Sequence, residues 1–122
     1  MKILTLIIKQ KYFDAILAGR KVQEFREVRP TTYAKYIEID EEGYGKLDEQ
    51  NNEVAIKYDA IRFYVGYNKN RSTALVEVKD AYTRILVDET DTPIEYEYKG
   101  QKWIAEEVVY DLGRIIEYDT KK

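Results

Sequence analysis

The chain has 122 residues, of which 44% are hydrophobic and 35% charged, a size and composition typical of one globular domain. Its formal net charge of −3 and pI of about 5.2 argue against a protein that coats nucleic acid through bulk charge. The absence of Cys and His excludes disulfides, metal sites built on these residues and His-based catalytic triads. We therefore expect one domain over residues 1–122, with no metal site and no cofactor.

The N-terminal residues predict a strand followed by a helix. Residues 3–8 are apolar and rich in β-branched side chains, which is typical of a buried strand. Phe13, Ile16 and Leu17 then stand at helical spacing, and Gly19 is a natural helix stop. The apolar run is too short for a signal peptide and no segment could span a membrane, so we expect a cytoplasmic protein.

A second strand is predicted over residues 21–28, because polar and apolar side chains alternate along it. One face carries Val22, Glu24, Arg26 and Val28, and the other carries Lys21, Gln23, Phe25 and Glu27. Pro30 ends this strand because it cannot donate to a sheet.

The segment after Pro30 is predicted to be mostly irregular. Thr31 or Thr32 can cap a short helical turn over residues 33–36. Residues 38–53 are acidic and polar, and we expect a solvated excursion with room for a short hairpin rather than a calcium loop.

The second half of the chain predicts strands. Ile61, Phe63 and Val65 alternate with polar residues in a half-buried strand over 60–67. We further expect a long or bent strand at 72–87, a short one at 94–98, an ambiguous segment at 103–110, and a bend at 112–118 leading into a terminal strand. Strands dominate without a βαβ rhythm. The sequence therefore predicts an α+β fold: a small, mostly antiparallel β-barrel with one or two short helices.

The most distinctive local pattern lies at the junction of the first helix and the second strand. It reads Gly19-x-Lys21-x-x-Glu24-x-Arg26. Glu24 and Arg26 share one strand face, and Lys21 stands at the corner, so the three side chains can surround a small polar pocket. The alternative is an exposed salt-bridge set, which would contribute about 0–1 kcal/mol.

This pattern, placed after a short strand and helix, resembles the signature of the ASCH domain family. Residues 58–63, 74–78 and the pair Leu112-Gly113 extend the resemblance, although Val22 stands where many members have Thr. The resemblance implies a PUA-like β-barrel with a cleft beside the first helix, and binding of RNA or a nucleotide.

One bacterial branch of that family, similar in size, hydrolyses acetylated cytidine. The resemblance then implies Lys21 and Glu77 as catalytic residues, with Glu24 at the position of that branch's Thr. Because a carboxylate does not replace an activated hydroxyl, an enzyme of this kind would need Lys21, Glu24 or Glu77 to activate water.

Tyrosine is abundant, and Tyr64 and Tyr67 lie close in sequence to Arg62, Lys69 and Arg71. A base can stack on such a ring while the cations meet a phosphate. The alternative is a solvated hairpin tip, since Tyr is also a good strand former.

Three functions remain open at this point. A binding module for RNA or a nucleotide-like small molecule would use Lys21, Glu24, Arg26, Tyr64 and Tyr67. A small amidohydrolase would act on an N-acylated nucleoside through Lys21, Glu24 and Glu77. An accessory protein would act through protein contacts alone.

Overall fold

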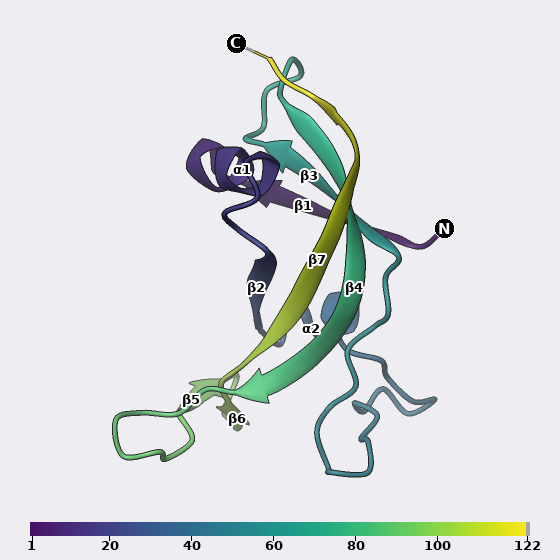
Figure 1. Ribbon diagram of the computed structural model, residues 1–122. Helices are drawn as coiled ribbons and strands as arrows, with labels where there is room; N and C mark the ends of the chain where they lie inside the picture. The colour runs from purple at the N-terminus through teal and green to yellow at the C-terminus, as the bar shows by residue number, and fades with distance from the viewer. Residues whose placement is uncertain (122) are drawn as a thin grey trace. The chain divides into compact units, whose positions relative to one another are not determined.

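Strands make up most of the regular structure in the computed structural model, which describes residues 1–121 (Figure 1). The elements in chain order are β1 (Ile3–Ile8), α1 (Gln10–Leu17), β2 (Gln23–Val28), α2 (Tyr33–Tyr36), β3 (Ala60–Val65), β4 (Thr73–Ile85), β5 (Glu95–Tyr98), β6 (Gln101–Ile104) and β7 (Glu106–Asp119). The α+β class is confirmed. No helix within these residues is long and apolar enough to cross a membrane.

The main sheet has five strands in the order β1-β3-β4-β7-β2, and β5 pairs with β6 in a separate two-stranded sheet. In the described part of the chain β1 and β2 are edges, so the sheet is not closed and the predicted barrel is not confirmed. The β1–β3 pair is parallel, with Ile3 opposite Ala60, whereas β3 and β4 are antiparallel. A parallel pair requires a crossover, which residues 9–59 provide.

The chain divides into two compact units. The first comprises Met1–Glu24, Lys57–Asp80 and Tyr110–Lys122, and the second Phe25–Ile56 and Ala81–Val109. By sequence count the first has 13 Lys and Arg against 8 Asp and Glu, and the second has 7 against 15. Their formal charges are therefore +5 and −8, and we call them the basic unit and the acidic unit.

The core of the basic unit lies between α1 and one face of the sheet. The buried side chains are Leu4, Leu6 and Ile8 of β1, Ile61 and Phe63 of β3, and Ala74 and Val76 of β4. Phe13 and Ile16 of α1 are 1% and 4% exposed, as their helical spacing predicted. Burial of each such large side chain contributes about 1.5–3 kcal/mol.

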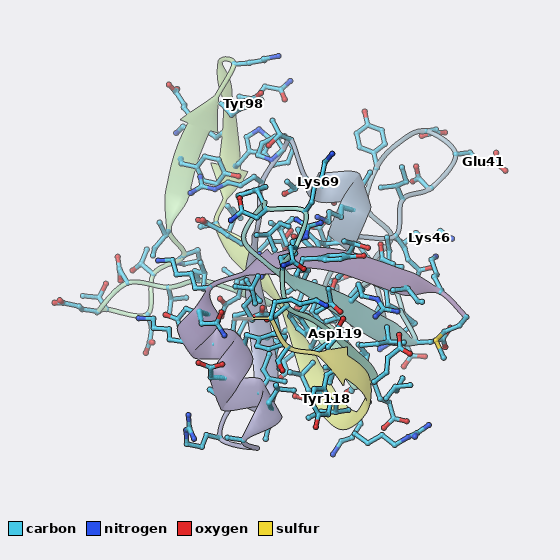
Figure 2. All side chains as sticks on the ribbon, turned by 90° about the horizontal axis from the view of Figure 1, so that it is seen from above. Glu41, Lys46, Lys69, Tyr98, Tyr118 and Asp119 are labelled. Carbon is cyan, nitrogen blue, oxygen red and sulfur yellow. The ribbon has the colours of Figure 1, made fainter. Side chains whose placement is uncertain are left out.

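In the acidic unit, three turns share one design. Each begins with an aspartate whose Oδ1 accepts the backbone N–H groups two and four residues later, and each has a positive φ at its fourth residue. The turns are Asp40–Tyr44, Asp48–Asn52 and Asp88–Thr92, closed by the bridges Ile39–Gly45, Leu47–Glu53 and Val87–Pro93. The predicted excursion is thus a pair of ordered turns, and Glu41 points outward at the first (Figure 2).

Near the C-terminus one prediction was wrong, and one segment left open between helix and strand is now assigned. β7 runs through Leu112 and Gly113 without the predicted bend, and it incorporates most of the ambiguous 103–110 segment. The Glu77 carboxylate occupies the space that a Cβ at position 113 would need. The lack of a side chain at Gly113 therefore makes room for the Glu77 side chain of β4, and the glycine does not break β7.

Candidate functional site

The corner between α1 and β2 is built by the end of the helix. Gly19 has a φ of +76°, a left-handed conformation that glycine adopts readily at a helix C-terminus. The N–H groups of Arg20 and Lys21 donate to the Ala15 carbonyl at 2.9 and 3.1 Å. These bonds turn the chain sharply and place Lys21 where β2 is about to begin.

Lys21 and Glu24 form an ion pair that is largely shielded from water. Lys21 Nζ lies 3.2 Å from Glu24 Oε1, and the two side chains are 18% and 7% exposed. Lys21 Nζ also lies 5.5 Å from the centre of the Tyr12 ring. Because both side chains are largely buried, the pair is not the exposed surface salt bridge of the alternative interpretation. A buried carboxylate depends strongly on a nearby cation, so Glu24 needs Lys21.

A pocket of about 210 Å³ opens beside Lys21 in the basic unit. Ile16 and Leu17 of α1 and Val76 of β4 form apolar walls, and residues 112–115 of β7 complete it. Lys21 and Arg114 are its cations. The pocket thus combines apolar walls with two cationic side chains, of which Lys21 is paired with Glu24, and this suits the anionic end of a small ligand.

Glu77 is not among the residues that line this pocket, although its carboxylate contacts two residues that do. The carboxylate lies against Gly113, and Glu77 Oε1 accepts the Arg114 backbone N–H at 3.3 Å. The observed role of Glu77 is to link β4 to β7.

Tyr64 and Tyr67 are also not among the residues that line the Lys21 pocket. Tyr64 is on β3, at the end that pairs with Thr73 of β4. The Arg71 guanidinium lies 4.1 Å from the centre of the Tyr64 ring and donates to the Gly66 carbonyl. One face of Tyr64 is therefore already covered, whereas Tyr67 is 84% exposed.

The remaining predicted site residue, Arg26, lies on β2 in the acidic unit and is half-buried. The residues that line the Lys21 pocket all belong to the basic unit. Of the five predicted ligand-binding residues, Lys21 and Glu24 form an ion pair, and Arg26 lies two residues beyond Glu24 on β2.

Sequence reasoning missed Arg114 and a carboxyl pair in the acidic unit. Glu106 is 8% exposed and hydrogen-bonds Glu53 beside a pocket of about 320 Å³ that Thr83 and Lys102 also line. Burial, then the hydrogen bond and the charge of Glu53, raise the pKa of Glu106 to about 9. The sequence signal for Glu106 is its alternation with Val108 and Tyr110, which places all three side chains on one face of a strand.

Within residues 1–121, no group of three or more carboxylate side chains is placed to hold a metal ion. Comparison of the chain with family models, curated proteins and solved structures found no match.

Proposed function

We propose that the protein is a binding module for a small, anionic, nucleotide-like ligand, which includes the end of a single-stranded RNA. The observation that carries this proposal is the apolar-walled pocket at the α1–β2 corner, with Lys21 and Arg114 in its lining. The excess of cations in the basic unit supports it, because a positive field attracts phosphate.

The proposed roles follow from the contacts. Lys21 and Arg114 meet the phosphate or another anionic group, and Glu24 holds Lys21 in place through the 3.2 Å ion pair. Ile16 and Val76 contact the apolar part of the ligand. A volume of about 210 Å³ is small for a ligand pocket, so one phosphate or one ring enters while the remainder stays outside.

We also propose a relationship to the PUA-like fold of ASCH domains. The Gly19-x-Lys21-x-x-Glu24-x-Arg26 pattern supports it, together with the strand and helix that precede the pattern. In this chain the sheet remains open between β1 and β2.

The test is a thermal-shift screen of nucleosides, nucleotides and short single-stranded RNAs, with hydrolysis of acetylated cytidine followed by chromatography. At about a hundredfold excess over Kd, a ligand raises the free energy of unfolding by about 2.7 kcal/mol. We expect stabilisation by phosphorylated members without turnover. Turnover would instead establish the amidohydrolase, and stabilisation by none of them would refute both functions.

A further inference from the structure

The acidic unit contains a second pocket, of about 390 Å³, with aromatic walls. Tyr33, Tyr44 and Trp103 supply three rings, and Pro30 and Ile39 are among the other lining residues. The Tyr33 and Trp103 ring centres lie 6.1 Å apart with the planes at 68°, so these rings form two walls at a steep angle.

The chain builds this pocket from three separate segments. Tyr33 begins α2, Tyr44 ends the Asp40–Tyr44 turn, and Trp103 lies on β6. Trp103 Nε1 is buried without a hydrogen-bond partner in the described structure. The three rings offer π-surface, and the polar atoms that they carry are two tyrosine hydroxyls and one indole N–H.

A carboxylate stands directly behind one wall. The Tyr33 hydroxyl and Glu53 Oε2 occupy the space that a Cβ at position 45 would need, so both oxygens abut the Gly45 backbone that lines the pocket. Glu53 also hydrogen-bonds the buried Glu106. Within residues 1–121 neither carboxyl forms an ion pair with Lys or Arg.

The formal charge of the acidic unit as a whole favours a cation. The acidic unit has 15 acidic side chains against 7 basic ones, and no Lys or Arg is among the lining residues. Phosphate-bearing ligands are disfavoured in such a field. A primary ammonium would lose its hydration and find few acceptors on the rings, whereas a methylated ammonium is weakly hydrated and suits aromatic walls.

We propose that the pocket walled by Tyr33, Tyr44 and Trp103 binds an organic cation of the methylated-ammonium class. The rings contact the methyl groups through cation–π attraction, and Glu53 supplies the counter-charge. This site is independent of the Lys21 pocket and is assigned a ligand of opposite charge.

The test uses the fluorescence of Trp103, the single tryptophan of the chain. The full-length protein is titrated with choline and, separately, with 3,3-dimethyl-1-butanol, its neutral isostere. We expect saturable change with choline and none with the alcohol at the same concentrations. Equal affinity for the two, or no saturable choline signal up to about 50 mM, would overturn the proposal.

Two variants locate the binding. Tyr44 is 70% exposed, so Tyr44→Leu keeps apolar bulk at little risk to folding, and Glu53→Gln removes the charge. Each is expected to weaken choline at least about tenfold. Tyr118→Leu, at a tyrosine 62% exposed in the basic unit, is the matched control and should bind normally. Unchanged affinity in both pocket variants, with melting curves showing them folded, would overturn the assignment.

Discussion

At the residue scale, the Lys21–Glu24 pair links the fold to the proposed function. The two side chains are 18% and 7% exposed, so each depends on the other for a favourable environment. Removal of one partner is therefore a test of stability as well as of binding.

Lys21→Met is expected to destabilise the protein by about 3 kcal/mol, because it removes the cation beside a buried carboxylate. The double variant Lys21→Met/Glu24→Leu should recover most of that loss, since no buried charge remains. Urea denaturation of the two variants and the native protein measures both effects. Equal destabilisation of the single and double variants would show that the pair's charges do not determine the loss.

Glu106 gives a pH-dependent prediction. Its pKa is raised to about 9 in the folded protein by burial and by Glu53, against an ordinary value near 4.5. Between these pH values the folded state holds a proton that the unfolded state releases, so its stability contribution falls as pH rises from about 4.5 to 9.

Glu106→Gln removes this titration and should flatten the dependence of the melting temperature on pH over that range. It should also raise the melting temperature at pH 8 relative to the native protein. Differential scanning calorimetry from pH 5 to 9 makes the comparison. If the melting temperature of Glu106→Gln depended on pH as steeply as that of the native protein, groups other than Glu106 would be responsible for the pH dependence.

At the scale of elements, the sequence predicted those strands and helices whose hydrophobic residues recur at a regular spacing. Alternation located β2, β3 and most of β4, and helical spacing located α1, because each element buries one side. The turns in 40–52 were missed because they depend on an Asp side chain and a positive φ, not on hydrophobic periodicity.

In the candidate site too, contacts between residues close in sequence were predictable, and contacts that depend on strand pairing were not. Lys21 and Glu24 are three residues apart, so their meeting was predictable from local spacing. The placement of Glu77 and Tyr64 depends on which strands pair and on which face each residue lies. To predict that Arg114 lines the pocket, one must know that β7 lies next to β4, and no pattern within either strand specifies this.

Gly113 tests the close contact between β4 and β7. Gly113→Ala places a methyl group against the Glu77 carboxylate, which can move aside but then loses its hydrogen bond from the Arg114 N–H, at a cost of about 1 kcal/mol. In a Glu77→Ala background the same substitution should cost distinctly less. A double-mutant cycle by chemical denaturation measures the coupling, and additive losses would mean that the Glu77 contact is not the reason for glycine.

At the scale of the whole molecule, the net charge of −3 conceals two opposite charges. The basic unit has +5 and the acidic unit −8. The argument from pI against bulk nucleic-acid coating therefore holds for the chain as a whole but does not describe the surroundings of the Lys21 pocket. The division could not be recognised earlier, because each unit combines segments that are distant in sequence.

The most direct measurement of the central claim is calorimetric titration of a phosphorylated ligand from the screen into Arg114→Gln and Lys57→Gln. Arg114 is exposed at the pocket, whereas Lys57 forms a surface ion pair with Asp80 in the same unit. Each variant loses one positive charge. We predict at least about tenfold weaker binding in Arg114→Gln and nearly native binding in Lys57→Gln. Equal weakening in the two variants, or none in Arg114→Gln, would contradict the assignment of the ligand to the α1–β2 corner.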